Sequence, residues 1–343
     1  MATDVSIEIL DLRHFAAPLL RAVLDAEAEL WRQRLHWDYR TSSKLLMQYL
    51  DSHSLPGYAA VEAGQVTGYA FCVYEETKAV IGDVFALSSA AAAFNLPPGS
   101  AAALAEQNNP LSAHEIEQTL LKHLFEMLLN SPNVDRVESQ LLLHPSGVHL
   151  GLFQQAGFEL FRRFFMVQQL QGLWNQPRVD LPQELEMRPW REDDLAPAGK
   201  LIAEAYRDHP DSFINDQYRS VHGSQRFLSN IVRYSGCGVF SPQISHVVAN
   251  RHSRELVALV LGSRVSPQSG HITQLCVHPA WRRNGLARMM LSVAAFHFLR
   301  HGASEISLTV TASNTPAIEL YHSEGYTCAH AFDAAVWQRS RIA

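Results

Sequence analysis

The sequence is short of cysteine and of long apolar runs, and each shortage excludes a class of protein. Its four cysteines (Cys72, Cys237, Cys276, Cys328) are far apart and form no CxxC pair, which disfavours a disulfide framework or a cysteine-based zinc site and favours free buried thiols. The longest apolar runs, such as residues 256–262, are too short to span a bilayer. The first residues, MATDVSIEILDLR, carry acids where a signal peptide needs basic and then apolar residues. We therefore expect a cytoplasmic protein that does not bind a membrane.

Basic charge is also scarce and unevenly spread. The 343 residues include 28 Lys and Arg against 34 Asp and Glu, a formal net charge of −6. Residues 1–183 hold 12 basic and 20 acidic side chains, whereas residues 184–343 hold 16 and 14. No basic field covers the protein, so we expect no nucleic-acid partner, and the C-terminal half is the better host for a phosphorylated ligand.

The order of predicted elements occurs twice along the chain, which is long enough for two domains. The first series is a helix at 15–35, a turn-rich stretch, strands at 58–62, 66–74 and 83–87, an Ala/Pro/Gly-rich insertion at 88–110, a helix at 111–129, and strands at 136–143 and 161–170. The second series is a strand at 185–188, a helix at 193–206, strands at 246–249, 256–265 and 271–278, a helix at 286–300, a strand at 305–311, a short helix and a last strand. The segment from Leu152 to Phe158 (LFQQAGF) matches that from Leu320 to Tyr326 (LYHSEGY). We interpret this as a duplicated α+β (α/β layered) domain, with boundaries 1–172 and 185–343 and a linker at 173–184.

The most informative segment, ITQLCVHPAWRRNGLA at residues 272–287, predicts an anion site. A β-branched strand stops at Pro279, and a polar loop leads into a helix that begins near Leu286 and ends at Gly302. The first amides of a helix have no intrahelical acceptor, and the helix dipole favours an anion there. Gly285 lets the backbone approach a phosphate closely, and the neighbouring arginines add positive charge.

Two motifs in the C-terminal half resemble the signatures of the GCN5-related N-acetyltransferase (GNAT) family. Arg282-Arg283-Asn284-Gly285-Leu286-Ala287 is similar to the family's acetyl-CoA loop, Gln/Arg-x-x-Gly-x-Gly/Ala, and follows Val277-His278-Pro279. The second motif runs from Asn314 through Leu320-Tyr321 to Gly325-Tyr326. The close match covers about residues 270–327, and a looser one reaches back to Leu185. The resemblance implies two tandem GNAT-like domains, each a mixed, mostly antiparallel sheet flanked by helices.

The resemblance also implies a role for each site residue. The backbone of Leu275, Cys276 and Val277 would pair with the pantetheine arm of acetyl-CoA like an added strand. The loop amides would hold the pyrophosphate, and the implied cofactor-binding residues of this loop are Arg282, Arg283, Asn284, Gly285, Leu286, Ala287 and Arg288. Asn314 would hydrogen-bond the pantetheine, although capping the following helix is an equally complete account of it.

Two side chains are candidates for the chemistry. Tyr321 is placed by the resemblance to protonate the departing coenzyme A thiolate; the alternative is a packing tyrosine. His271 corresponds to the position of the family's general base. One alternative is that His271 is only a surface histidine. Another is that a water chain reaching an Asp or Glu elsewhere accepts the proton. The segment 207–241 would contact the acceptor, and its acids Asp208, Asp211 and Asp216 would attract a cationic amine.

The N-terminal half lacks this chemistry. Its counterpart of the arginine-glycine loop is LSSAAAAFNLPP at residues 87–98, and no Lys or Arg occurs between Lys78 and Lys122. Glu115 and Glu117 begin the next helix, and Phe153 stands where Tyr321 stands. We therefore predict a degenerate N-terminal copy that has lost cofactor binding and shapes the substrate cleft.

Together these features predict an N-acyltransferase that moves an acetyl group from coenzyme A to a primary amine, by direct attack in a ternary complex and without a metal. The acceptor would be a small molecule or peptide, and the protein a monomer or homodimer. Mycothiol synthase is one tandem member of the family with a degraded N-terminal domain, whereas tandem relatives that use aminoacyl-tRNA generally lack the Arg-x-x-Gly-x-Ala loop. The alternatives are a non-catalytic acyl-CoA sensor and a protein-interaction scaffold.

Overall fold

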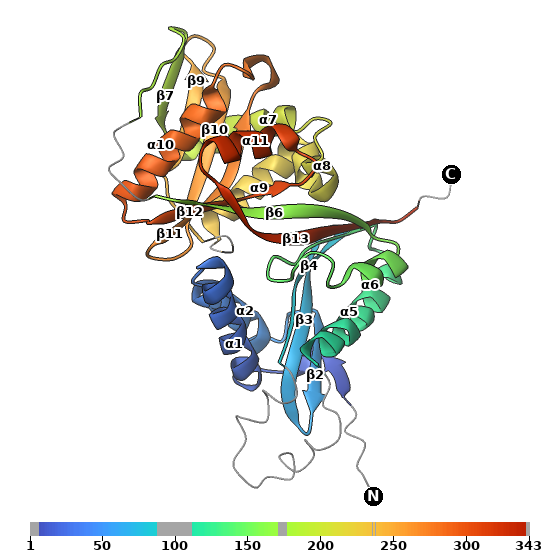
Figure 1. Ribbon diagram of the computed structural model, residues 1–343. Coiled ribbons are helices and arrows are strands. Elements are labelled where there is room, and N and C mark those ends of the chain that lie inside the picture. The colour runs from blue at the N-terminus through green and yellow to red at the C-terminus, as the bar shows by residue number, and fades with distance from the viewer. Residues whose placement is uncertain (1–6, 88–111, 171–176, 235, 237, 341–343) are drawn as a thin grey trace, which may run out of the picture. The chain divides into compact units, whose positions relative to one another are not determined.

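A computed structural model describes residues 7–87, 112–170, 177–234, 236 and 238–340 (Figure 1). The chain forms two compact units, here called unit 1 and unit 2. Unit 1 comprises Met1–Leu35, Ser43–Leu160 and Phe332–Ala343, and unit 2 comprises His36–Ser42 and Phe161–Ala331. The predicted domains, 1–172 and 185–343, are contiguous in sequence, whereas these units are not.

Unit 1 is a sheet with helices on both faces. Its strands lie in the order β1 (Glu8–Asp11), β2 (Gly57–Glu62), β3 (Gln65–Glu75), β4 (Lys78–Ala86), β5 (Arg136–Gln140) and the last part of β13 (Thr327–Gln338). Only β4 and β5 pair in parallel. The remaining elements are η1 (Leu12–His14), α1 (Ala17–Leu35), α2 (Arg40–Asp51), α5 (Ala113–Leu129) and α6 (Leu150–Gln155). Helices α1 and α5 lie on opposite sides of β3 (Figure 1). Tyr69 of β3 packs toward α1, and its neighbour Ala70 packs toward α5, because successive strand residues point to opposite faces.

Unit 2 repeats this arrangement. Its strands lie in the order β7 (Leu185–Pro189), β9 (His246–Asn250), β10 (Leu256–Arg264), β11 (Ser269–Val277), β12 (Glu305–Thr311), β6 (Glu159–Gln169) and the first part of β13, with the short β8 (Val239–Phe240) on β10. Its helices are η2 (Glu192–Asp194), α7 (Leu195–Ala205), α8 (Asp211–Ile214), η3 (Asp216–Arg219), α9 (Val221–Arg233), η5 (Pro279–Trp281), α10 (Leu286–Arg300) and α11 (Thr315–Ser323). In β10, Ala258 and Val260 face α10, whereas Leu259 and Leu261 face α7 and α9.

Matching irregularities confirm the predicted duplication of an α+β layered fold. The β3–β4 ladder shifts register at Phe71/Cys72, and the β10–β11 ladder shifts at the equivalent Leu261/Gly262. Both units also end their short helix with a left-handed glycine, Gly157 (φ 83°) and Gly325 (φ 88°). In both units, the aromatic residue after this glycine donates its amide at 3.0 Å to the carbonyl five residues earlier.

The two units exchange strands. β6 follows α6 in the chain but pairs with β12 of unit 2, and the last residues of β13 pair with β5 of unit 1. The predicted boundary assigned 161–170 to the first domain, whereas the structure places it in unit 2. In each unit one strand edge needs a further strand to cover it: β13 pairs with β5, and β6 pairs with β12. Local sequence patterns cannot tell which copy supplies the covering strand.

Two local predictions were wrong. The stretch predicted as turn-rich contains α2, whose buried residues Ser43, Leu46 and Leu50 follow a helical period. Strand β4 begins at Lys78 rather than at residue 83. The buried ammonium of Lys78 lies 3.1 Å from Glu75 and 3.4 Å from Glu138, and this ion pairing lets a charged residue sit inside the sheet.

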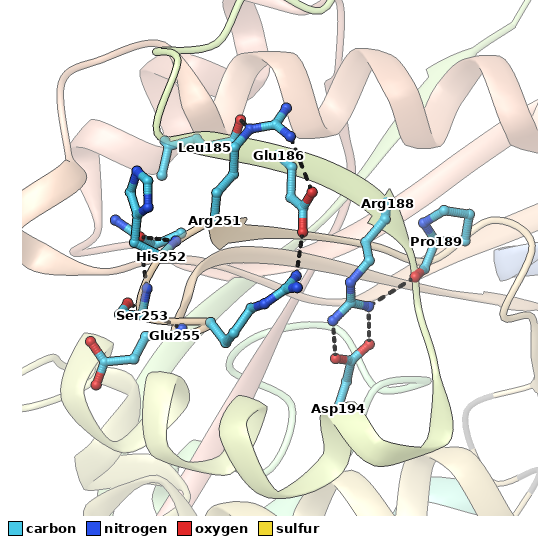
Figure 2. Close-up of polar contacts among 11 residues, drawn as sticks. Leu185, Glu186, Arg188, Pro189, Asp194, Arg251, His252, Ser253 and Glu255 are labelled. Atoms are coloured by element: carbon cyan, nitrogen blue, oxygen red, sulfur yellow. Dashed lines mark hydrogen bonds and ion pairs between the residues drawn. The ribbon is translucent and has the colours of Figure 1, made fainter.

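A partly buried ion pair fixes the start of α7 against strand β7 (Figure 2). The Arg188 guanidinium donates to both carboxylate oxygens of Asp194, at 2.6 and 2.7 Å, and the Arg191 amide donates to the same carboxylate at 2.8 Å. Two parallel bonds to one carboxylate hold both partners in a fixed orientation. The pair therefore sets the direction of α7, whose last residue contacts the candidate site.

The described residues agree with two of the exclusions drawn from composition. Within them, no helix has both the length and the hydropathy to cross a bilayer. Cys72 and Cys276 are buried free thiols as predicted, whereas Cys328 is exposed. Cys237 lies outside the described residues.

Candidate active site

Strand β11 separates from β12 halfway along its length. Its residues Ser269–Ile272 pair in parallel with Glu305–Leu308, and beyond Ile272 the described residues provide no partner on that side. The register shift at Leu261/Gly262 accompanies this separation. The predicted pantetheine-binding residues Leu275, Cys276 and Val277 lie on this unpaired edge. An unpaired edge exposes backbone donors and acceptors that an extended ligand can use as a strand would.

The loop after β11 exposes a row of backbone amides. Arg283 (φ 67°) and Gly285 (φ 76°) adopt left-handed conformations, and Gly285 is the N-cap of α10 with no side-chain cap. Within the described residues, the amides from Arg283 to Ala287 have no recorded backbone acceptor. A Cβ placed on Gly285 would meet no atom within 4 Å. The exposed loop is therefore open to a ligand and suits an anion.

The three arginines of the loop have different partners. Arg282 donates to the carbonyl of Ala205 at the end of α7 (2.6 Å) and to that of Val277 (3.3 Å), so it braces the loop. Arg288 forms an ion pair with Glu324. Among the described residues, Arg283 has no recorded side-chain partner and is exposed, which leaves its guanidinium available to a phosphate.

Asn314 is placed at the start of α11. Its side-chain oxygen accepts from the Ala317 amide at 3.4 Å, so the capping role is present, although the bond is long. Its side-chain nitrogen lies 3.1 Å from Nε2 of His209. The Asp211 amide donates to Nδ1 of the same ring at 3.1 Å. Both ring nitrogens thus face N–H groups, and a neutral imidazole can accept from only one of them. His209 lies beside the Asn314 amide, which sequence reasoning did not anticipate.

Tyr321 lies buried one helical turn after Ala317. Burial raises the pKa of its hydroxyl, the negative charge of Asp211 raises it further, and the guanidinium of Arg163 opposes both. A phenol with a raised pKa holds its proton at neutral pH and can act as a donor. Of the three acids predicted to attract an amine, Asp211 is thus the one that influences Tyr321.

Sequence reasoning missed the polar group around Asp211. Thr311 of β12 donates to the carboxylate of Asp211, and Arg163 of β6 lies 3.9 Å from it. Tyr206 donates to Oε1 of Gln274 at 3.1 Å, while the buried Nε2 of Gln274 makes no hydrogen bond within the described residues. These residues come from distant segments without a shared motif, so only the polar positions at strand ends could have suggested them.

His271 is enclosed in the core of unit 2 rather than exposed at the surface. Its Nδ1 lies 2.9 Å from the Ser307 hydroxyl, and its ring packs against Trp37 and Phe165. Burial, aided by the charge of Arg163, lowers its pKa to about 3. A base with so low a pKa is poorly matched to accept a proton at neutral pH.

The segment predicted to contact the acceptor, 207–241, contributes α8, η3, α9 and β8. Its first residues and α7 line an open cavity of about 840 Å³, whose wall includes Tyr206, Ser212 and Phe213. Both charge signs occur in the wall, from Lys200 to Asp208. The cavity can accept a polar molecule, and its charges do not select one sign.

Unit 1 differs from unit 2 at both equivalent positions. A capping box closes the start of α5: the Glu115 amide donates to Ser112 Oγ, and the Ser112 amide donates to the Glu115 carboxylate. Phe153, the counterpart of Tyr321, packs against Phe125 and Phe158. The predicted degenerate loop, 87–98, lies outside the described residues except for Leu87.

Comparison with known proteins agrees with this geometry. Residues 183–326 match the Acetyltransferase (GNAT) family. Solved structures with a similar fold include a GCN5-related N-acetyltransferase from Sphaerobacter thermophilus (16% identity, TM-score 0.61, 97% of each chain). A tandem GNAT protein from the clavulanic acid biosynthesis pathway is also similar (11%, TM-score 0.57, 98% of this chain and 100% of that one). A glucosamine N-acetyltransferase region of a fungal multi-domain β-N-acetylglucosaminidase matches 98% of this chain and 38% of that one (10%, TM-score 0.58). No curated protein matches the sequence.

Residues 183–326 thus match the acetyltransferase (GNAT) family, and the chain as a whole has a fold similar to that of tandem GNAT proteins. The resemblance predicted from the two motifs is confirmed for these residues, and the fold supports acyl transfer in general.

Proposed function

We propose that the protein transfers an acetyl group from acetyl-CoA to a primary amine, and that unit 2 performs the reaction. The observation that carries the proposal is the unpaired edge of β11, which leads directly into the exposed amides around Gly285. The pantetheine would extend along Leu275–Val277, and the pyrophosphate would accept bonds from the loop amides and from Arg283. The side-chain amide of Asn314 would hold the pantetheine from the opposite side.

The chemical step requires a proton donor for the leaving thiolate. As the amine nitrogen bonds to the thioester carbon, the carbon–sulfur bond breaks and negative charge develops on sulfur. Tyr321 would donate its proton there, because its raised pKa keeps it protonated until that charge appears. The new amide and free coenzyme A would then leave.

The amine must lose a proton before or during its attack. We assign its attraction, and proton acceptance through water, to Asp211 rather than to His271. Asp211 is a carboxylate near Tyr321, whereas the pKa of His271 is about 3 and its Nδ1 contacts Ser307. Arg163 and Thr311 would hold the Asp211 carboxylate in place.

Unit 1 would bind no acetyl-CoA. The Glu115 amide of α5 donates to Ser112 in the capping box, and the Glu115 carboxylate adds negative charge where a pyrophosphate would lie. Phe153 offers no hydroxyl to a thiolate. One cofactor per chain is therefore expected.

The test is the release of free coenzyme A thiol from acetyl-CoA by the full chain, in the presence of a panel of amines. The panel contains a polyamine, a lysine peptide, a peptide with a free N-terminus, and glucosamine, the last because one structure of similar fold is a glucosamine N-acetyltransferase region. Amine-dependent release with formation of the N-acetyl product supports the proposal. Acetyl-CoA binding without turnover on any amine would favour the sensor, and failure to bind acetyl-CoA would favour the scaffold.

A further inference from the structure

Unit 1 contains a cluster of three histidines and one glutamate that the acyl transfer does not use. We call His114, Glu117, His144 and His149 the His–Glu cluster. His114 and Glu117 lie one turn apart at the start of α5, His144 lies in the loop after β5, and His149 is the N-cap of α6. Ligand atoms of His114, Glu117 and His149 all lie within 4.8 Å of one another.

The cluster holds buried nitrogens without partners. His149 is 5% exposed, and neither ring nitrogen makes a hydrogen bond within the described residues, although Nε2 lies 3.4 Å from Glu117 Oε2. Nδ1 of His114 and Nδ1 of His144 are likewise buried without a partner there. An unsatisfied buried polar group costs on the order of 1–3 kcal/mol, so several in one place need an explanation.

The spacing of these atoms suits a metal ion better than a set of hydrogen bonds. Zinc binds nitrogen and oxygen ligands at about 2.0–2.2 Å, so two ligands of a tetrahedral site lie roughly 3.3 Å apart. The 3.4 Å separation between His149 Nε2 and Glu117 Oε2 agrees with this value. His144 Nε2 lies 3.3 Å from Glu117 Oε1, so it can hold the carboxylate in one orientation without itself binding the metal.

The position of the cluster in the repeat is informative. It lies between the start of α5 and the β5–α6 connection, and the same elements in unit 2, α10 and the β12–α11 connection, carry Gly285 and Asn314. A cavity of about 480 Å³ adjoins the cluster and is lined by Phe85 and Ala86 of β4 together with three cluster residues. The place that suits a cofactor in unit 2 thus carries metal-ligand residues in unit 1.

We propose that the His–Glu cluster binds one divalent transition-metal ion, zinc in the first instance, through His114, Glu117 and His149. His114 would bind through Nδ1, which places its proton on Nε2. The Gln118 side-chain nitrogen lies 2.9 Å from Nε2, so this amide would turn over to let its oxygen accept that proton. The fourth position faces the cavity. The prediction that no metal is bound was based on the spacing of the cysteines. It did not consider His114 and Glu117, which are three residues apart in the sequence.

The test is metal binding by the full chain after treatment with a chelator. Calorimetry with ZnCl₂ should show one tight site, and CoCl₂ should give the visible absorption of a four- or five-coordinate ion. His149→Ala and Glu117→Gln should weaken the affinity for zinc at least ~10–100-fold. A loss of this size is typical even when the removed residue only hydrogen-bonds to a metal ligand. His123→Ala, on the same helix but outside the cluster, is the control and should bind as wild type does.

Folding is checked separately, so that an unfolded variant cannot imitate a lost site. The thermal midpoint of the metal-free wild type should rise on addition of zinc, and that of the His149→Ala protein should not. A wild type that binds no zinc, or cluster variants that bind it as tightly as the His123→Ala control, would overturn the proposal. The outcome does not depend on acetyl transfer, since none of these measurements uses acetyl-CoA.

Discussion

Gly285 and Gly302 allow the cofactor loop to be tested with a matched pair of substitutions on one helix. Gly285 precedes α10 and Gly302 follows it, with φ angles of 76° and 89°. A Cβ at either position would meet no atom within 4 Å. Alanine at each position should therefore cost only the left-handed conformation, roughly 1–2 kcal/mol. At about 2–4 °C per kcal/mol, the two alanine variants should lower the thermal midpoint by similar amounts.

Glutamate at the same positions separates backbone strain from charge. Near the pyrophosphate, a carboxylate 4 Å from one phosphate charge costs about 1 kcal/mol in water. Two phosphates give about 2 kcal/mol, so Gly285→Glu should weaken the Kd for acetyl-CoA roughly 30-fold. Gly302→Glu carries the same charge at the opposite end of the helix and should leave the Kd unchanged.

Isothermal titration calorimetry with acetyl-CoA on all four variants measures this difference. Each titration is accompanied by a thermal melt, so that a lower affinity can be compared with any loss of folded protein. If Gly285→Glu and Gly302→Glu bind equally well, the loop does not hold the phosphates. The cofactor would then bind elsewhere, and the assignment of unit 2 as the active unit would be wrong.

Three further predictions follow from the same structure. Tyr321→Phe should lower kcat by ~10²–10⁴-fold with the Kd for acetyl-CoA unchanged, in steady-state and binding assays, whereas Tyr326→Phe should not. Asp211→Asn should raise KM for the amine and alter the pH profile of kcat/KM, whereas Asp193→Asn, at an exposed acid outside the cavity wall, should do neither. Burial raises the pKa values of the neighbouring Glu27 and Asp83, so the folded chain keeps protons on this pair to higher pH than the unfolded chain does, and the unfolding free energy should fall as pH rises through the raised values. Glu27→Gln should flatten that fall in urea titrations at several pH values, and the exposed Glu29→Gln should not.

Each of these has an outcome that contradicts it. Equal turnover by the two phenylalanine variants would remove Tyr321 from the proton transfer. An unchanged pH profile in Asp211→Asn would show that Asp211 does not accept the proton of the amine. Parallel pH dependence in wild type and Glu27→Gln would show that Glu27 is ionised in the folded chain.

Local patterns were sufficient for most elements and for the shape of the loop that we propose holds the cofactor. Strand, proline, loop and helix in residues 272–287 fold as predicted because each step depends on neighbours in sequence: Pro279 ends the strand, and Gly285 adopts the left-handed conformation at the helix start. The repeated LFQQAGF and LYHSEGY segments form the same turn for the same reason.

The surroundings of the chemistry could not be predicted in this way. The acid near Tyr321 depends on α8, and its partner Arg163 arrives on β6, a strand that precedes the rest of unit 2 in the chain. His271 also matched the position of a base, but the ring of Trp37 from a distant segment helps to enclose it in a dry environment. The pKa of a side chain depends on its burial and on charges from every element packed against it, and neither can be read from the spacing of residues in the sequence.

By itself, the sequence determined the duplicated α+β fold, the family of its C-terminal half and the loop expected to hold the cofactor. The tertiary structure alone decided which strand covers each sheet edge, which of the candidate acids lies by the tyrosine, and that histidines from separate segments meet Glu117 in unit 1. The difference has one physical cause. Helices, turns and caps are stabilised by bonds between residues close in the chain, whereas strand exchange and clustered side chains are stabilised by contacts between residues far apart in it.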